Sequence, residues 1–307
     1  MLNSIKDQWI KLKENINNKD YIIINQLQNI CKKIDKSELK LELDYKLALV
    51  NETTDINNIN EFMYFIGDEL IGYIGIFSFS GKTTTLEVNG MVHPEHRRKG
   101  IFSTLYKLLI SEAERRNTKE IMFLSDRESL SGQKFIKKTG AEYKHSEYEM
   151  YLDYEFVSKN KFLKEIEIRK ATNSDSHEIS RQNTIYFSEE SHNPIKKDSI
   201  DIDLTFIPEE EEKRGVIAYI AINNNEVIGK VHLQIYEGVG GIFGLGVLPE
   251  YRGKGYGRTI LILAVNMLKE KGAKKIMLQV ESKNFNALNL YKSCGFYETS
   301  VMEYYIK

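Results

Sequence analysis

A short segment in the C-terminal half combines glycines with basic side chains. It is Arg252-Gly253-Lys254-Gly255-Tyr256-Gly257, followed by Arg258 and a predicted helix from 259 to 271. Glycines let the backbone turn tightly and leave no Cβ in the way of a ligand. The first turn of a helix offers unpaired N–H groups and the positive end of the dipole. The segment therefore predicts a phosphate or pyrophosphate site, although a solvated glycine-rich turn would have the same pattern.

Two well-known phosphate loops do not fit this segment. The Walker pattern G-x-x-x-x-G-K-[ST] is absent from the chain. The Rossmann fingerprint opens a parallel βαβ unit, whereas this segment follows a predicted hairpin and a third strand. A dinucleotide site is therefore not expected.

The elements around the segment follow from hydrophobic periodicity. In the C-terminal half we expect strands at 215–222, 227–236, 242–248, 275–280 and 302–306, and helices at 259–271 and 286–293. Gly238, Gly240 and Gly241 are expected to interrupt the chain before the third strand. In the N-terminal half the same order predicts strands at 63–66, 70–79, 85–92, 121–124 and 147–152, and helices at 102–116 and 131–138.

The chain repeats itself. Pro94–Phe102 resembles Pro249–Gly257 at an offset of 155 residues, and Glu69–Gly72 matches Glu226–Gly229 at an offset of 157. A duplicated domain explains both matches better than two unrelated loops of similar composition. We expect an N-terminal helical appendage at 1–38 with one or two amphipathic helices around Trp9 and Ile22–Ile30, an N-terminal domain at 39–155 and a C-terminal domain at 165–307.

Length and composition limit the classes of function. The 307 residues suggest two domains, and 43 Lys+Arg against 44 Asp+Glu give no overall field for nucleic acid or an anionic membrane. Cys31 and Cys294 lie far apart, which argues against a disulfide framework or a zinc site. The N-terminus does not have the pattern of a secretory signal, and the apolar run Ile260–Val265 is too short to span a membrane. A cytoplasmic protein with no metal, nucleic-acid or membrane partner is expected.

The stretch Leu245–Gly257 resembles the acyl-CoA-binding signature of the GNAT superfamily of N-acetyltransferases. Leu278–Asn284, followed by Ala287–Phe296, is similar to that family's second motif. The resemblance covers the C-terminal half and, more loosely, residues 40–155, so the chain looks like a tandem member, as in mycothiol synthases. It implies an α/β (α+β) fold of tandem GNAT domains. Each would be a mixed, mostly antiparallel splayed sheet flanked by helices.

The resemblance also implies how acetyl-CoA, the acyl-donor substrate, would bind. Backbone groups of Leu245, Gly246 and Val247 would pair with the pantetheine arm, and Asn284 would lie beside the cofactor. The pyrophosphate would bind the backbone N–H groups of Arg252, Gly253, Lys254, Gly255, Tyr256 and Gly257. Tyr291 would be the general acid that protonates the departing thiolate; a helix residue packed on the sheet is the alternative.

The general base remains unassigned. Several relatives have glutamate at the position of Gln279, and glutamine cannot accept the proton. Glu237 and Glu281 are weak candidates, because such carboxylates are usually exposed and a solvated surface position is the favoured interpretation of each.

The N-terminal copy departs from the motif. Phe102 stands at the position of Gly257, Ile136 at that of Tyr291, and Ser129 at that of Asn284. A side chain at Phe102 would obstruct the approach to phosphate, and isoleucine cannot donate a proton. We expect this half to be catalytically silent, and whether it binds CoA is left open.

These observations favour transfer of an acetyl group from acetyl-CoA to a primary amine of a small-molecule or amino-acid-like acceptor. A non-catalytic acyl-CoA-binding regulatory module and a protein N-terminal or lysine acetyltransferase are the alternatives. The acceptor site is expected around Ser180–Pro194, where Tyr186, Phe187, Glu189, Glu190 and His192 cluster. The sequence does not identify the acceptor or the oligomeric state.

Overall fold

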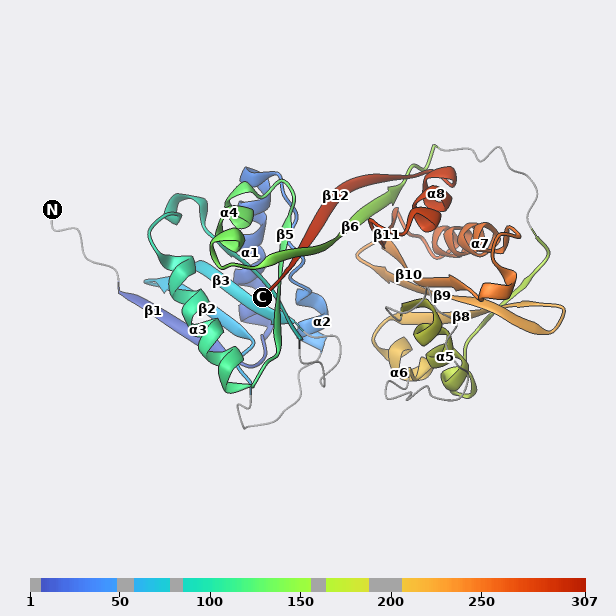
Figure 1. Ribbon diagram of the computed structural model, residues 1–307, viewed down its shortest axis with the longest axis horizontal. Coiled ribbons are helices and arrows are strands. Elements are labelled where there is room, and N and C mark those ends of the chain that lie inside the picture. Colours follow the sequence, from blue (N-terminus) through green and yellow to red (C-terminus); the bar gives the residue numbers. More distant parts are fainter. Residues whose placement is uncertain (1–6, 49–57, 78–84, 156–163, 188–205) are drawn as a thin grey trace. The chain divides into compact units, whose positions relative to one another are not determined.

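The computed structural model describes residues 7–48, 58–77, 85–155, 164–187 and 206–307. The chain forms two compact units (Figure 1). Unit 1 comprises Met1–Glu147 together with Ser300–Lys307, and unit 2 comprises Tyr148–Thr299.

Unit 1 contains a mixed sheet in the order β1-β2-β3-β4-β5-β12. Neighbouring strands are antiparallel except for the parallel pair β4–β5. The strands are β1 Gln8–Lys13, β2 Glu61–Ile66, β3 Glu69–Phe77, β4 Thr85–Val92, β5 Glu120–Asp126 and the end of β12 Phe296–Ile306. The helices are α1 Asn18–Asp35, α2 Leu43–Ala48, α3 Ile101–Arg115 and α4 Leu130–Lys138, with a 3-10 turn, η1, at Pro94–His96.

Helices cover both faces of this sheet. Leu105 and Leu109 of α3 pack with one set of strand residues, whereas Ile24 and Leu27 of α1 pack with Met63 and its neighbours on the opposite face. Alternate residues of a strand point to opposite faces, so each strand contributes to both layers.

Unit 2 repeats this architecture in the order β6-β11-β10-β9-β8-β7, with β10–β11 as the parallel pair. Its strands are the end of β6 Glu142–Leu152, β7 Glu167–Lys170, β8 Val216–Asn223, β9 Glu226–Tyr236, β10 Val239–Val247 and β11 Lys275–Glu281. Its helical elements are η2 Asn173–Asp175, α5 Ser176–Phe187, α6 Pro208–Lys213, η3 Pro249–Tyr251, α7 Tyr256–Glu270 and α8 Phe285–Ser293. Helices α7 and α8 pack on one face, and α5 on the other. The expected mixed fold is confirmed.

The last strand of each unit comes from the other half of the sequence. Strand β12 ends in unit 1, where Met302–Ile306 pair with β5, and β6 ends beside β11 in unit 2. Residues 300–307, which belong to the predicted second domain, therefore lie with unit 1.

Two local expectations were wrong. The segment around Trp9 is strand β1, not a helix: it pairs with β2, and the Trp9 ring stacks on Phe65 at 4.2 Å. Gly240 and Gly241 do not interrupt the chain but lie inside β10. A Cβ on Gly240 would lie 3.1 Å from Leu268 and Ala273, so glycine allows α7 to pack closely on the strand. The helix expected at Ile22–Ile30 is confirmed as α1.

Among the described residues, no helix has both the length and the apolar character needed to cross a membrane.

Candidate functional site

Strand β10 leaves both of its neighbours over one short segment. Its parallel pairing with β11 ends at Ile242 and Leu278, and its antiparallel pairing with β9 shifts between Phe243 and Gly246. Gly244, with a φ of 54°, lies inside this β-bulge. The segment contains the predicted residues Leu245 and Gly246, and Val247 follows. Gly246 and Val247 still pair with Lys230 and Gly229 of β9. Towards β11, however, no pair follows Ile242, so the backbone groups of this segment are outside that ladder and an extended ligand can pair with them.

The predicted phosphate segment is the N-terminus of α7. Gly255 is the N-cap residue, with a φ of 93° and no side-chain cap, so N–H groups of the first turn remain available to an anion. No described atom lies within 4 Å of a Cβ built on Gly253, and only Lys164, at 3.9 Å, approaches one built on Gly255. The outer side of the loop is therefore accessible to a ligand.

The three basic side chains of this segment do different things. Arg252 Nε donates to the Val247 carbonyl at 2.9 Å, which ties the loop to the end of β10. Lys254 lies exposed, with Nζ 5.6 Å from the centre of the Tyr251 ring. Arg258 is committed elsewhere, because its guanidinium donates to Ser293 Oγ at 2.8 Å and joins α7 to the end of α8.

Helix α8 and its N-cap contain the two remaining predicted residues. Asn284 is its N-cap, and its side chain accepts a hydrogen bond from Ala287 N at 3.1 Å. Tyr291 is only 7% exposed and belongs to the cluster against which Leu245 and Val247 pack. Burial raises the pKa of Tyr291 to about 12, so it keeps its proton at neutral pH. Its hydroxyl makes no hydrogen bond within the part of the chain that the structure describes.

Gly257 lies where these three elements meet. A Cβ built on it would lie 3.4 Å from Leu290 of α8 and 3.7 Å from Val247 of β10. The structure therefore brings together the end of β10, the start of α7 and helix α8.

The base candidates from the sequence lie in exposed positions. Gln279 and Glu281 are exposed on β11, and Glu237 is exposed in the turn before β10. Glu237 precedes β10, and the bulge lies towards the other end of that strand. None of these side chains is buried beside the bulge.

Two polar residues that the sequence pattern did not single out are buried beside the bulge. Lys230 and His232 lie on β9, with 0% and 8% of their surfaces exposed. Lys230 Nζ donates to the Gly244 carbonyl at 3.0 Å and lies 3.4 Å from His232 Nε2. Burial lowers the pKa of Lys230 to about 7, and burial together with the Lys230 charge lowers that of His232. A lysine and a histidine at alternate positions of an otherwise apolar strand were the available signal.

Tyr186 of α5 covers this part of β10. A Cβ built on Gly246 would fall 2.1 Å from the Tyr186 ring, so only glycine fits beneath it. The Tyr186 hydroxyl donates to Gln182 Oε1 at 2.8 Å. Phe187, a further acceptor-site candidate, is the last residue of α5, whereas Glu189, Glu190 and His192 lie outside the described residues.

The equivalent region of unit 1 differs at the strand. The parallel β4–β5 pairing ends at Val88 and Phe123, but the β3–β4 pairing stays regular to its end. Arg97 Nε donates to the Val92 carbonyl at 3.0 Å, as Arg252 does in unit 2. The rest of the Arg97 guanidinium donates to both oxygens of Asp35 at 2.7 and 2.6 Å. This arginine is already neutralised by α1.

Phe102 occupies the remaining space in unit 1. Its ring packs edge-on against Phe135 with 4.6 Å between centroids, and its Cε2 would lie 3.0 Å from a Cβ built on Gly90. The ring therefore covers β4 just beyond its last pair with β5. At the equivalent position in unit 2, Gly257 has no side chain.

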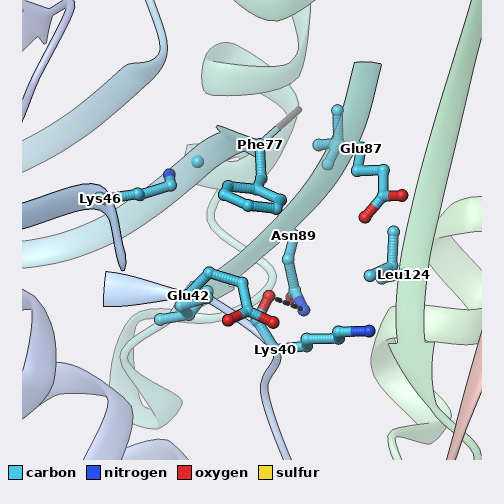
Figure 2. Close-up of a pocket in the computed structure, with 10 residues that line it drawn as sticks. Lys40, Glu42, Lys46, Phe77, Glu87, Asn89 and Leu124 are labelled. Carbon is cyan, nitrogen blue, oxygen red and sulfur yellow. Dashed lines mark hydrogen bonds between the residues drawn. The ribbon is translucent and has the colours of Figure 1, made fainter. Parts of the chain in front are cut away.

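Unit 1 also has a small pocket lined by both charged and apolar side chains (Figure 2). Ten residues line it: Lys40, Leu41, Glu42, Lys46, Gly75, Phe77, Glu87, Val88, Asn89 and Leu124. Lys46 pairs with the buried Glu61 at 2.9 Å, and Lys40 pairs with Glu147 at 3.1 Å. The lysines of the lining are thus engaged in internal ion pairs, as expected for a structural network.

Comparison with known proteins gives a consistent result. A model of the acetyltransferase (GNAT) family matches residues 26–141 and 178–296. The [ribosomal protein bS18]-alanine N-acetyltransferase of Haemophilus influenzae is 34% identical over 84 residues, which are 27% of this chain and 57% of that protein. A mycothiol acetyltransferase of Renibacterium salmoninarum is 27% identical over 113 residues, 34% of this chain and 33% of that protein. The matches thus span about half, or less, of these relatives.

Solved structures share the fold over nearly the whole chain. A GCN5-related N-acetyltransferase from Sphaerobacter thermophilus superposes with a TM-score of 0.75 at 16% identity, covering 97% of this chain and 95% of that one. A tandem GNAT protein from the clavulanic acid biosynthesis pathway gives a TM-score of 0.71 at 13% identity, covering 98% of both chains. At these identities the likeness concerns the fold alone.

Proposed function

The chain belongs to the acetyltransferase (GNAT) family, and we propose that unit 2 transfers an acetyl group from acetyl-CoA to a primary amine of a small-molecule or amino-acid-like acceptor. One observation carries the proposal. Among the described residues, only unit 2 combines an opening between its parallel strands, β10 and β11, with a bulge in β10 and an α7 N-terminus that has no side-chain cap.

The two ends of acetyl-CoA would use different parts of this arrangement. The N–H groups from Arg252 to Gly257 would bind the pyrophosphate, supported by the dipole of α7 and the charges of Arg252 and Lys254. The pantetheine arm would lie in the opening beside β10, paired with backbone groups of Leu245, Gly246 and Val247. Asn284, whose side-chain oxygen caps α8, would present its amide N–H groups to the cofactor.

Tyr291 is proposed as the general acid. It is protonated at neutral pH because burial raises its pKa to about 12, and its hydroxyl makes no hydrogen bond to other described residues. It can therefore donate a proton to the thiolate as the thioester breaks.

Unit 1 is proposed to be silent in transfer. The Phe102 ring covers β4, Asp35 neutralises Arg97, and the position of Tyr291 is held by Ile136. These three differences would remove cofactor space, phosphate affinity and the proton donor respectively.

The names of relatives support an amine acceptor, because they include an alanine N-acetyltransferase and mycothiol acetyltransferases. A regulatory acyl-CoA-binding module and a protein N-terminal or lysine acetyltransferase remain the competing functions. The Tyr291 geometry favours turnover over binding alone.

The proposal is tested by measuring thiol release from acetyl-CoA across a panel of small amines, amino acids and peptides. Tyr291→Phe should lower kcat about 10²–10⁴-fold while leaving the acetyl-CoA Kd within about 2-fold. The matched control is Tyr297→Phe, since Tyr297 is exposed. Binding of acetyl-CoA without thiol release would support the regulatory module. Activity that survives Tyr291→Phe but is lost on Arg97→Ala would assign transfer to unit 1.

A further inference from the structure

We propose that Lys230 is the group that accepts the proton of the acceptor amine, held in place by the Gly244 carbonyl and His232. This inference rests on the proposed function of unit 2 and supplies the base that the sequence leaves unassigned.

The side chain of Lys230 reaches the one part of β10 that is free of regular pairing. Lys230 is opposite Gly246 in the β9–β10 register, and its Nζ lies 3.0 Å from the Gly244 carbonyl. A Cβ built on Gly244 would lie 3.1 Å from Nζ and 3.3 Å from His232 Nδ1. Both polar groups are therefore packed against the segment where the thioester is proposed to bind.

Polar and aromatic groups from three elements lie near Lys230 Nζ. On β9 the group is His232, which stacks on Phe206 at 4.6 Å, and on β10 it is the Gly244 carbonyl. From α5, the Tyr186 ring lies 5.7 Å from Nζ.

Further charges lie beyond the Tyr186 ring. The Arg252 guanidinium is 5.9 Å from its centre, and Arg181 is paired with Glu178 at 2.7 Å. Glu250 also acts on the Tyr186 hydroxyl. Burial is the cause that lowers the pKa of Lys230 to about 7, from an ordinary value of 10.5. Lysine is thus substantially neutral at pH 7 and can accept a proton.

Unit 1 provides an internal comparison. The position equivalent to Lys230, at the offset of 157 residues found in the sequence, is Tyr73. Tyr73 is equally buried, but it donates to Glu61 and accepts from Lys46 at 3.2 Å. The β3–β4 pairing beside it has no bulge. The fold therefore accepts a tyrosine at this position in unit 1. The lysine is found in unit 2, where the β9–β10 pairing has a bulge.

The proton balance is complete. The acceptor ammonium gives one proton to Lys230 Nζ, through one bridging water because Nζ is buried, and the amine attacks the thioester carbonyl. A C–N bond forms and the C–S bond breaks, and Tyr291 protonates the thiolate. The acetylated nitrogen then loses one further proton, which restores the phenol of Tyr291, and Lys230 releases its proton to solvent. The products are the N-acetyl amide, CoA thiol and one proton.

The test is the pH dependence of kcat/KM for two acceptors whose amine pKa values differ. Wild-type enzyme should lose activity below about pH 7 with both acceptors, because protonated Lys230 cannot act as a base. Lys230→Arg retains donors for Gly244 but stays protonated, and Lys230→Met is close to isosteric. Both variants should lower kcat about 10²–10⁴-fold. Neither should show the fall in kcat/KM below about pH 7 that is expected of the wild-type enzyme. The acetyl-CoA Kd should change by less than about 3-fold.

Three results would contradict the inference. The first is a wild-type profile in which kcat/KM does not fall below about pH 7 with both acceptors. This result contradicts a base role for Lys230 even if neither variant folds. Lys230→Arg with activity within about 10-fold of wild type would mean that the lysine only holds the bulge. A fall that persists unchanged in Lys230→Met would assign it to another group. Absence of thiol release in wild type would overturn the proposed function as well, whereas the other outcomes leave that function intact.

Discussion

Single residues of unit 2 have charge states that depend on what surrounds them. Lys230 is buried and its pKa falls, whereas Tyr291 is buried and its pKa rises, because burial disfavours the charged form of each. With a pKa of about 7, about half of Lys230 is a neutral amine at pH 7, and Tyr291 is a protonated phenol. These are the forms that proton acceptance and donation require.

A carboxylate in the same unit, Asp175, is instead stabilised in its charged form. Asp175 accepts two hydrogen bonds from Arg169 at 2.8 and 2.7 Å and one from Thr172 N at 2.8 Å. Mainly because of the Arg169 bonds, the pKa of Asp175 falls from 3.8 to about 2. Its stabilising effect is therefore present above pH 4 and is lost as the pH falls towards 2.

Asp175→Asn should lower the free energy of unfolding of unit 2 by about 1–2 kcal/mol at pH 7, discounted because Arg169 is partly exposed. The difference from wild type should shrink as the pH falls towards 2. Chemical denaturation at pH 7, 4 and 2.5 measures this, with Glu210→Gln, in an exposed ion pair, as control. A destabilisation that is equally large at pH 2.5 would show that the carboxylate charge is not its cause.

At the scale of elements, the two units differ in the space beside the central strand after its parallel pairing ends. This space is open beside β10 and filled beside β4. Both have a parallel strand pair that separates after four residue pairs. In unit 2 the separated end meets a glycine-rich helix start, whereas in unit 1 the Phe102 ring fills the corresponding place. One residue near the start of a helix is thus proposed to decide whether acetyl-CoA can enter.

Gly257→Phe should reproduce this obstruction in unit 2. The acetyl-CoA Kd should rise at least about 100-fold, equivalent to about 2.8 kcal/mol, as measured by calorimetry. Gly257→Ala adds a Cβ that makes an ordinary 3.4 Å contact. The fold should tolerate it, with a change in the free energy of unfolding within about 1 kcal/mol. Phe102→Leu in unit 1 is the matched control and should leave acetyl-CoA affinity unchanged. Equal loss of affinity in that control would place the cofactor in unit 1.

At the scale of the whole molecule, each compact unit depends on a strand from the other half of the sequence. Tyr304 and Tyr305 of β12 are 3% and 5% exposed, and they pack with residues of unit 1. Their strand covers the edge of β5 by antiparallel pairing. If the chain were cut at the repeat boundary, each half would lack the strand that covers an edge of its sheet: β5 would lose β12, and β11 would lose β6.

Removal of residues 300–307 should therefore destabilise unit 1, although the deleted residues follow unit 2 in the sequence. Loss of two buried tyrosines predicts a cost of at least about 3 kcal/mol. Hydrogen exchange should show faster exchange in α3 and β5 than in wild type, with α7 amides little changed. Tyr297→Ser, an exposed substitution in β12, is the control. Equal loss of protection in α3 and α7 would contradict the assignment of this strand to unit 1.

The sequence by itself determined the features that depend on neighbouring residues. The glycine-rich segment from Arg252 to Gly257, the internal repeat and the order of strands and helices follow from local backbone freedom and periodicity. The same local information failed at Trp9, because the strand there is stabilised by pairing with β2 and by stacking on Phe65.

The tertiary structure alone decided the features that depend on distant residues. The bulge in β10 exists only relative to the register of β9, and the charge state of Lys230 depends on everything that removes water from it. The obstruction by Phe102 requires Phe135 and Gly90 as neighbours, and the partner of β12 is set by pairing across more than 170 residues. Such contacts have no local signature, because register and burial are properties of the assembled sheet.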